Sequence, residues 1–262
     1  MSPAGPAGSA EPDRQTGPGR RGGNDDSAVA DRIRTNLEAV RGRIRVACEA
    51  AGRDPGDVRL LLATKTVEPE RIRVAIEAGA TLVAENRVQE VRPKYEALAD
   101  LEYERHFIGH LQSNKINALV PYISCLQSLD RTSLARKLQK RLDREDESLD
   151  VLLQVNTSRE QSKFGLEPAD LEAFATEVSR LDRIRIKGLM TIGLYTDDPD
   201  LARPSLRDLR ELRDRVRQLN LEGVEMDELS MGMSGDLEVA IEEGATIVRV
   251  GTAVFGEREL PG

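Results

Sequence analysis

The sequence predicts an α/β fold, a single (β/α)8 barrel of the TIM type, and two observations carry that prediction. Eight short apolar runs alternate with helical patterns along the chain, as they do where helices join the strands of a parallel sheet. The length of 262 residues suits one closed barrel, which typically takes about 250 residues. Because aromatic residues make up only 3% of the chain, branched aliphatic side chains must fill the core.

The amino-terminal part of the chain is predicted to precede the barrel. Residues 1–26 are rich in Gly, Pro, Ala and Ser and show no apolar periodicity, so we expect a disordered tail there. The barrel domain then spans residues 27–262. An extra N-terminal helix opens it, with Ser27 as the predicted N-cap and Gly52 as the stop. Its apolar stripe recurs at steps of three and four: Val29, Ile33, Leu37, Val40, Ile44 and Cys48.

The alternation of strands and helices fills the rest of the chain. The predicted strands are residues 58–64, 81–84, 106–108, 123–127, 151–155, 184–190, 228–230 and 246–250. The predicted helices are residues 69–78, 88–98, 114–119, 133–142, 168–181, 204–219 and 235–243. No Gly-x-Gly-x-x-Gly motif follows the first strand, which argues against an open dinucleotide-binding sheet. The chain ends soon after the eighth strand, so we expect no second domain.

Composition argues against several functional classes. A net charge of −8 with interspersed acids and bases offers no basic stripe for nucleic acid. No apolar run is long enough to span a bilayer, and no apolar stretch follows the pair Arg20-Arg21 as an export signal requires. We therefore expect a cytoplasmic protein, and a monomer because no apolar stripe is left exposed. The few histidines and cysteines show no metal-ligand spacing, so neither a metal site nor a disulfide is predicted.

Polar and glycine residues follow the predicted strands, at the face where such barrels place their active sites. Residues 230–236 (SMGMSGD) lead from the seventh strand into a helix, where free amides and small residues suit an anion. Gly251 and Thr252 follow the eighth strand, and the loops after strands seven and eight commonly bind phosphate. The alternative is that Ser234 is only a helix N-cap and the glycines only form turns.

Lys65 is the candidate nucleophile because it ends an apolar strand aimed into the barrel. A partly desolvated amine keeps a lone pair, which Schiff-base formation with an aldehyde requires. The alternative is a strand-end lysine that reaches solvent or pairs with Glu85. Two lysines compete with it at the same rim: Lys115 and Lys163. Three others are expected on solvated helix faces: Lys94, Lys137 and Lys140.

Arg249 lies in the apolar run of the eighth predicted strand, and a buried arginine needs an acceptor. That acceptor is either a core carboxylate or the ring nitrogen or phosphate of a ligand. A lysine amine, an anion site and a buried arginine on one rim describe a pocket for a phosphorylated aldehyde, of which pyridoxal phosphate is the common one. An aldolase acting on a sugar phosphate would need the same parts, so these residues leave both possibilities open.

A series of motifs then narrows the choice. They are residues 61–66 (LLATKT), 85–90 (ENRVQE), 106–115 (HFIGHLQSNK), 163–165 (KFG), 188–191 (GLMT), 229–234 (LSMGMS), 248–252 (VRVGT) and 255–256 (FG). In these motifs the chain resembles the pyridoxal phosphate homeostasis proteins, a barrel family related to the N-terminal domain of alanine racemase. The resemblance runs from about residue 28 to Gly256 and is specific because so many segments occur in the same order.

The resemblance implies a role for each candidate residue. Lys65 is the implied Schiff-base lysine, Asn86 the residue beside the cofactor ring, and Arg249 the partner of the pyridine nitrogen. The implied phosphate contacts are Ser230, Ser234, Gly251 and Thr252. The implied pocket-lining residues are Met190 and Met231. Two departures stand out, since the family often has Ser where this chain has Thr64 and Tyr where it has Arg87.

Two functions remain after the resemblance. The first is a protein that binds pyridoxal 5'-phosphate and acts in its intracellular homeostasis by storage, buffering or delivery, with apo forms of cofactor-dependent enzymes as candidate recipients. The second is an amino-acid racemase- or decarboxylase-like enzyme. Racemisation needs a base on each face of the Cα carbanion, and in the related racemases the second base comes from a domain that this sequence is not expected to have.

The tyrosines and the arginine favour the binding protein. Three tyrosines are expected away from the rim (Tyr95, Tyr103 and Tyr122), and the sequence does not place Tyr195. An arginine at the pyridine nitrogen keeps that nitrogen unprotonated, which weakens the ring as an electron sink. A pocket without a covering domain also stays open to water. We therefore expect a cofactor-binding protein without strong catalytic activity of its own.

Overall fold

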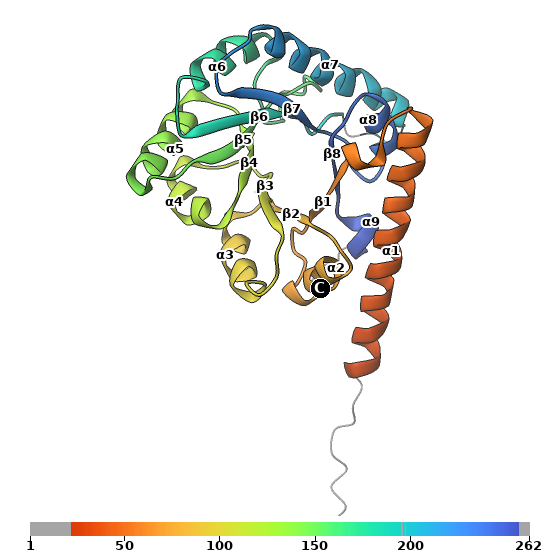
Figure 1. Cartoon of the computed structure of the whole chain (residues 1–262). Helices are drawn as coiled ribbons and strands as arrows, with labels where there is room; N and C mark the ends of the chain where they lie inside the picture. Colours follow the sequence, from red (N-terminus) through yellow and green to blue (C-terminus); the bar gives the residue numbers. More distant parts are fainter. Residues whose placement is uncertain (1–21, 195, 197, 257–262) are drawn as a thin grey trace, which may run out of the picture.

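The computed structural model describes residues 22–194, 196 and 198–256, and this part of the chain closes into a barrel of parallel strands (Figure 1). Each strand pairs with its neighbours in the sequence, and β1 pairs with β8 to close the ring. The predicted α/β barrel is therefore confirmed. Its strands are β1 (Arg59–Ala63), β2 (Leu82–Glu85), β3 (Glu104–Phe107), β4 (Cys125–Leu129), β5 (Leu149–Gln154), β6 (Ile184–Met190), β7 (Val224–Ser230) and β8 (Ile247–Val250).

The helices that follow the strands surround the barrel (Figure 1). They are α2 (Pro69–Glu77), α3 (Val88–Ala97), α4 (Ile116–Leu119), α5 (Thr132–Glu145), α6 (Leu171–Val178), α7 (Pro199–Gln218), α8 (Leu237–Glu242) and a short α9 (Thr252–Phe255) that the sequence analysis missed. Single 3₁₀ turns lie at Pro55–Asp57, Ser113–Lys115, Val120–Tyr122 and Pro168–Asp170. Helix α7 starts before the predicted residue 204 because Asp198 caps it, with Pro199 in its first turn.

The extra N-terminal helix is present but longer than predicted. Helix α1 (Gly22–Ala50) begins before Ser27, which therefore lies inside the helix and is not its N-cap. The last residues of the predicted tail, 22–26, belong to this helix, and residues 1–21 lie outside the described part. The predicted apolar stripe is buried from Ile33 to Cys48, and it packs against α2, α8 and α9 (Figure 1).

The apolar core has two parts, as the alternation of side chains in a barrel strand requires. The larger part lies between the strands and the surrounding helices. Inside the barrel, apolar side chains pack beside a few buried polar ones, and the apolar ones include Leu61, Leu82, Ala84, Ile247, Cys125 and Leu152. This filled interior closes the barrel below its rim, so that a ligand can enter only from the carboxyl ends of the strands.

Both cysteines are buried free thiols, Cys48 on α1 and Cys125 on β4. Burial raises the pKa of each thiol, and for Cys125 well above its ordinary value. In the described part of the chain, no helix combines the length and the apolar character that crossing a bilayer requires.

Strands β6 and β7 come together at Gly188. A Cβ atom at this position would lie 1.9 Å from the carbonyl oxygen of Glu228, which no side chain tolerates. The missing side chain is therefore what lets the two strands pair at the middle of the barrel, where Gly188 aligns with Glu228.

We expect Gly188→Ala to destabilise the barrel by about 3 kcal/mol, because the new methyl group must push backbone apart in a packed layer. Urea unfolding measures this loss. Gly42→Ala is the matched control, since a Cβ there meets only the Arg45 side chain at 3.8 Å, and we expect it to stabilise α1 by about 0.5–1 kcal/mol. Equal stabilities for the two variants would contradict this account of the β6–β7 contact.

Candidate functional site

A cavity of about 920 Å³ lies at the carboxyl ends of the strands. Its volume is in the range of small-molecule sites, and its position is the one where (β/α)8 barrels bind their ligands. The predicted site residues on its wall are Lys65, Asn86, Met190, Ser234, Arg249, Gly251 and Thr252. The structure thus brings these residues together from five different strand ends.

Two predicted site residues do not line this cavity. Ser230 is fully buried inside the barrel, where its hydroxyl accepts a hydrogen bond from Arg249 and donates one to Gln127. Met231 is fully buried in the apolar layer between the strands and the helices. Neighbouring residues of a strand face opposite sides of the sheet, so Ser230 and Met231 cannot both point into the barrel, and here neither reaches the cavity.

Lys65 lies at the tip of a turn that follows β1. The amide of Val67 donates to the carbonyl of Thr64 at 3.0 Å and closes the turn, and Thr66 adopts the left-handed conformation with φ of 62°. The Lys65 side chain is half-buried and lines the cavity. Its amine has no hydrogen-bond or ion-pair partner among the described residues, so it is available to a ligand.

The two competing lysines are placed differently. Lys115 is exposed and lies off the cavity wall. The Lys163 amine contacts Glu160 at 2.7 Å and donates to the carbonyl of Gly193 at 2.6 Å. Of the lysines in the described part of the chain, Lys65 is therefore the one that faces the cavity.

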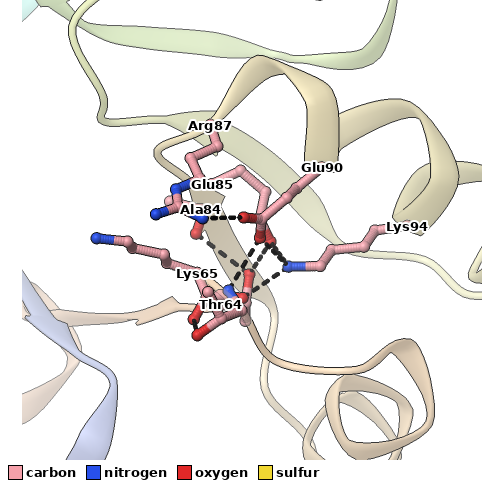
Figure 2. A network of polar contacts seen from close by, with 8 residues as sticks. Thr64, Lys65, Ala84, Glu85, Arg87, Glu90 and Lys94 are labelled. Atoms are coloured by element: carbon pink, nitrogen blue, oxygen red, sulfur yellow. Dashed lines mark hydrogen bonds and ion pairs between the residues drawn. The ribbon is translucent and has the colours of Figure 1, made fainter. Parts of the chain in front are cut away.

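Glu85 pairs with Lys94 and not with Lys65. Figure 2 shows the Lys65 side chain pointing away from the carboxylates, while the Lys94 amine lies among them. Lys94 donates to Glu85 at 2.7 Å, to Glu90 at 3.0 Å and to the carbonyl of Thr64 at 2.7 Å. The prediction of a solvated Lys94 is wrong, because its side chain is only 12% exposed and neutralises a carboxylate buried at the end of β2.

This network holds the backbone on both sides of Lys65. Lys94 binds the carbonyl of Thr64, the residue before it, and Glu90 accepts from the amide of Thr66, the residue after it, at 2.9 Å. Burial raises the pKa of Glu85 although Lys94 opposes that shift. Burial also acts to raise the pKa of Glu90, but the Thr66 amide and Lys94 outweigh it and lower that pKa. The turn is thus clamped by charged groups that lie off the cavity wall.

The two departures from the family motifs lie in or beside this network. The Thr64 hydroxyl donates to Glu85 and lies 3.2 Å from the carbonyl of Ala84, so it also serves the buried carboxylate. Arg87 is exposed, lies off the cavity wall and makes one long contact, 3.5 Å, with Glu90. Neither departure changes the surroundings of the Lys65 amine.

We expect Lys94→Met to destabilise the protein by about 3–5 kcal/mol at neutral pH, because it leaves the buried Glu85 carboxylate without its cation. The folded-state pKa of Glu85 is already raised, and losing Lys94 raises it further. Protonation of Glu85 therefore relieves the variant, and the loss should shrink as the pH falls from 7 toward that raised pKa. Urea unfolding over this range measures the effect.

Lys137→Met is the control for that experiment, because Lys137 is exposed on α5 and its removal should change the unfolding free energy by less than about 0.5 kcal/mol. A loss in Lys94→Met that stays constant as the pH falls would argue against the buried carboxylate as its cause.

The loops after β7 and β8 form one side of the cavity wall. Ser234 and Gly235 come from the first loop and Gly251 and Thr252 from the start of α9. The hydroxyls of Ser234 and Thr252 have no hydrogen-bond partner in the described residues. A Cβ at Gly251 would lie 2.9 Å from the carbonyl oxygen of Ala63, so only glycine lets β8 approach β1 here. The arrangement offers small residues and free hydroxyls to an anion.

The alternative role of Ser234 as a helix cap is not what the structure shows. Helix α8 begins after Asp236, which is its N-cap residue. The Asp236 carboxylate turns back and accepts from the amide of Met233 at 2.6 Å. Burial raises the pKa of Asp236, while the Met233 amide and Arg249 oppose that shift. The loop is thus held by Asp236, which leaves the Ser234 side chain free.

Helix α1 holds both loops from behind. Arg43 donates to the carbonyl of Ser234 at 2.9 Å and pairs with Glu238 at 2.7 Å. Asn36 donates to the carbonyl of Val254 in α9 at 3.1 Å. The extra N-terminal helix therefore stabilises the loops beside the cavity as well as covering the barrel.

Arg249 is held by neutral acceptors. Its side chain donates to the Ser230 hydroxyl at 2.9 Å and to the carbonyl of Thr191 at 2.6 Å. No carboxylate of the described residues lies within ion-pair distance of it, so the alternative of a core ion pair is not found. Burial lowers the pKa of Arg249 to about 10, and only the charge of Asp236 opposes that shift. The guanidinium is therefore still charged at neutral pH where it meets the cavity.

Several residues on the cavity wall were not assigned a role from the sequence. His110 stacks on Phe164 with ring centroids 3.9 Å apart, and Gln154 donates to the carbonyl of Phe164 at 3.0 Å. Arg71 also lines the wall and donates to the carbonyl of Phe255. His110 and Phe164 lie in recognised motifs, but no sequence pattern predicts that the loops after β3 and β5 meet.

The described tyrosines lie away from this cavity. Tyr95, Tyr103 and Tyr122 surround a separate small cavity of about 30 Å³ beside α3, which agrees with their predicted distance from the rim. Tyr195 lies outside the described residues. Within the part of the chain that the structure describes, no cluster of His, Cys, Asp and Glu side chains could hold a metal ion.

Comparison with known proteins gives the family. The family model of the alanine racemase N-terminal domain matches residues 35–259. The chain is 49% identical to the pyridoxal phosphate homeostasis protein of Aquifex aeolicus, over 85% of this chain and 97% of that protein. The chain belongs to the pyridoxal phosphate homeostasis protein family. The resemblance inferred from the motifs is therefore confirmed.

Two solved structures that this chain matches over nearly their whole length agree with this assignment. A protein from Bifidobacterium adolescentis, described only as unknown, is 42% identical, with a TM-score of 0.84 over 87% of this chain and 96% of that one. PipY of Synechococcus elongatus, solved with pyridoxal phosphate bound, is 32% identical, with a TM-score of 0.75 over 86% of this chain and 100% of that one. The barrel of this chain is thus close to that of a relative known to hold the cofactor.

Proposed function

We propose that this protein binds pyridoxal 5'-phosphate in the rim cavity as a Schiff base on Lys65 and acts in intracellular cofactor homeostasis. The observation that carries the proposal is the state of the Lys65 amine. It faces the cavity, it has no partner among the described residues, and the nearby carboxylates are already neutralised by Lys94. An amine in that state is free to react with an aldehyde.

The wall residues fit the cofactor in size and chemistry. Ser234, Gly251 and Thr252 would bind the phosphate through free hydroxyls and accessible backbone. Asn86 and Met190 would flank the ring. The buried Oδ1 atom of Asn86 has no hydrogen-bond partner among the described residues, so a polar ligand group would satisfy it. Condensation of the Lys65 amine with the aldehyde releases one water, and the reverse hydrolysis frees the cofactor again.

Arg249 would donate to the pyridine nitrogen. Because a charged guanidinium can only donate, it keeps that nitrogen as an acceptor without a proton. The resemblance implied that Ser230 contacts the phosphate. In this proposal Ser230 instead accepts a hydrogen bond from Arg249 inside the barrel and so helps to hold the guanidinium. We assign no ligand contact to Met231, which is fully buried in the outer apolar layer.

The names of the relatives support homeostasis over catalysis. The relative from Aquifex aeolicus is a pyridoxal phosphate homeostasis protein, and PipY is a relative with the cofactor bound. The described wall residues supply a single lysine amine, and their other titratable groups are the His110 imidazole and the carboxylates of Glu68 and Asp236. Asp236 already accepts from the Met233 amide, and none of the described tyrosines lines the wall, so neither a second amine nor a phenol is available there for proton transfer at a substrate carbon. A reversible attachment without efficient turnover suits storage, buffering or delivery to apo enzymes. We also propose that the protein acts in the cytoplasm as a monomer.

Reductive trapping tests the attachment site. We expect the protein incubated with pyridoxal 5'-phosphate and then borohydride to gain one pyridoxyl group, which peptide mass spectrometry places on Lys65. Lys65→Met should lose the adduct and the visible absorption, since no other lysine of the described residues faces the cavity. Lys163→Met is the matched control and should be labelled as the wild type, because Lys163 is already paired with Glu160. An adduct on another lysine, or none, would overturn the proposal.

Isotope exchange separates the carrier from the enzyme. We expect the loaded protein in D₂O to exchange the Cα proton of a panel of amino acids no faster than about tenfold above free pyridoxal 5'-phosphate, because an unprotonated ring nitrogen and a single amine give little carbanion stabilisation. Proton NMR of the amino acids measures the rate. Fast exchange that disappears in Lys65→Met would establish the racemase-like alternative in place of the carrier.

A further inference from the structure

A chain of hydrogen bonds crosses the barrel interior from Arg249 to the opposite end. Arg249 donates to the Ser230 hydroxyl at 2.9 Å, and that hydroxyl donates to Oε1 of Gln127 at 2.6 Å. The amide nitrogen of Gln127 lies 2.8 Å from Nδ1 of His106. The other ring nitrogen of His106, Nε2, lies 3.4 Å from a carboxylate oxygen of Glu104. All but Glu104 are buried, with Ser230 and Gln127 at 0% and His106 at 4% exposure.

The chain connects the cavity to the floor of the barrel. It passes from β8 through β7 and β4 to β3, beside the apolar side chains of the barrel interior. At the floor, Glu104 pairs with Arg59 at 2.5 Å, and Arg59 pairs with Glu228 at 3.2 Å. The side chain of Glu104 is 53% exposed, so one end of the chain meets solvent and the other meets the ligand cavity.

Elementary hydrogen-bond chemistry gives this chain one direction. An arginine can only donate, so the Ser230 oxygen accepts from Arg249 and the Ser230 proton needs another acceptor. That acceptor is Oε1 of Gln127, which turns the amide nitrogen of Gln127 toward His106. Because the amide nitrogen also only donates, Nδ1 of His106 must be unprotonated. The neutral ring then carries its proton on Nε2, which points to Glu104.

Protonation of His106 is incompatible with this donor-to-acceptor direction of the chain. The charged ring carries a proton on both nitrogens, so Nδ1 would face the amide hydrogens of Gln127. If the amide rotates to offer its oxygen, its nitrogen turns to Ser230, and the Ser230 proton loses its acceptor. Ser230 is 0% exposed, and a buried hydroxyl without an acceptor is unfavourable. The contact that orients Arg249 is therefore weakened when His106 becomes charged.

We propose that Gln127 and His106 are positioning residues for Arg249, and that protonation of His106 loosens the guanidinium and lowers the affinity for the cofactor. The part that concerns affinity rests on the proposed function. Since the effect is a coupling between two sites, bound cofactor must in turn oppose the protonation of His106. A change of protonation at the floor of the barrel would thus change the affinity of the cavity at the other end.

The groups around His106 are few and come from the barrel strands. Glu104 on β3, Arg59 on β1 and Glu228 on β7 carry charge at the floor. Asp150 on β5 is paired with Arg185 at 2.5 Å. The facing residues of β2 and β4, namely Leu82, Ala84 and Cys125, are uncharged. The hydrogen bond from His106, together with Arg59, lowers the pKa of Glu104 to about 2, so this acceptor stays ionised wherever an imidazole titrates.

The direction of the chain can be tested on the wild-type protein without cofactor. Histidine side chains labelled with ¹⁵N report their tautomer in long-range ¹⁵N–¹H spectra. The chain has two histidines, and His110→Gln assigns the two sets of signals. We expect His106 at pH 8 to be the neutral tautomer with its proton on Nε2. A proton on Nδ1 would overturn the proposal, whether or not the protein binds pyridoxal phosphate.

Cofactor affinity as a function of pH tests the coupling. Absorbance titration with pyridoxal 5'-phosphate is carried out from about pH 5 to 8, where imidazoles change charge, on the wild type, His106→Gln and Gln127→Met. His106→Gln retains an acceptor for Gln127 but cannot titrate. We expect the wild type to lose about tenfold more affinity on acidification than His106→Gln, which corresponds to about 1.4 kcal/mol. Gln127→Met should bind pyridoxal 5'-phosphate more weakly than the wild type at pH 8. On acidification it should lose as little affinity as His106→Gln does.

Two comparisons keep the outcomes distinct. His110→Gln removes the other histidine, which lines the cavity wall, so only its pH dependence is compared and not its absolute affinity. We expect it to keep the large loss of affinity on acidification, because His110 has no place in the chain of hydrogen bonds. If the wild type is labelled on Lys65 but all variants show its pH step, the coupling is refuted and the proposed function stands. If the wild type neither binds nor is trapped on Lys65, the proposed function fails, while the tautomer of His106 still decides the direction of the chain.

Discussion

The closure of eight parallel strands is the constraint on which the rest of this structure depends. It gathers the carboxyl ends of all strands around one cavity, and it sends alternate side chains into a common interior. Lys65, Asn86 and Arg249 come from β1, β2 and β8 and reach the same space for this reason. The same closure puts Ser230, Gln127 and His106 in contact although they lie far apart in the sequence.

Two lysines beside the first turn have different roles: Lys94 pairs with carboxylates, and Lys65 faces the cavity. The Lys94 side chain is only 12% exposed. Its amine donates to Glu85, to Glu90 and to the carbonyl of Thr64, and so neutralises the carboxylates beside β1 and β2. On the other side of the same turn, Lys65 has no partner among the described residues (Figure 2). A buried carboxylate needs a cation, and Lys94 supplies it for Glu85. The Lys65 amine is therefore not needed to neutralise these carboxylates.

The contacts of Arg249 also leave its charge available to the cavity. Arg249 is charged and buried, and its acceptors are neutral groups of the barrel interior and not a carboxylate. This leaves its positive charge directed at the cavity, where it suits an acceptor on the ligand. It also makes the orientation of the guanidinium depend on Ser230 and, through it, on groups as distant as His106.

The sequence by itself determined the barrel, the N-terminal helix, the family and the position of Lys65 and Arg249 at the rim, where both line the cavity. These features depend on local periodicity and on motifs within short segments. It misplaced Lys94, whose helix position looked solvated, because burial is decided by what packs above a helix and not by its own pattern. It could not tell that Ser230 and Met231 miss the cavity, that Asp236 and not Ser234 caps α8, or that His106 and Gln127 touch. Only the tertiary structure decided these points, because they depend on the register and curvature of neighbouring strands. The spacing of residues along the sequence does not give the distance between side chains on opposite strands of a barrel.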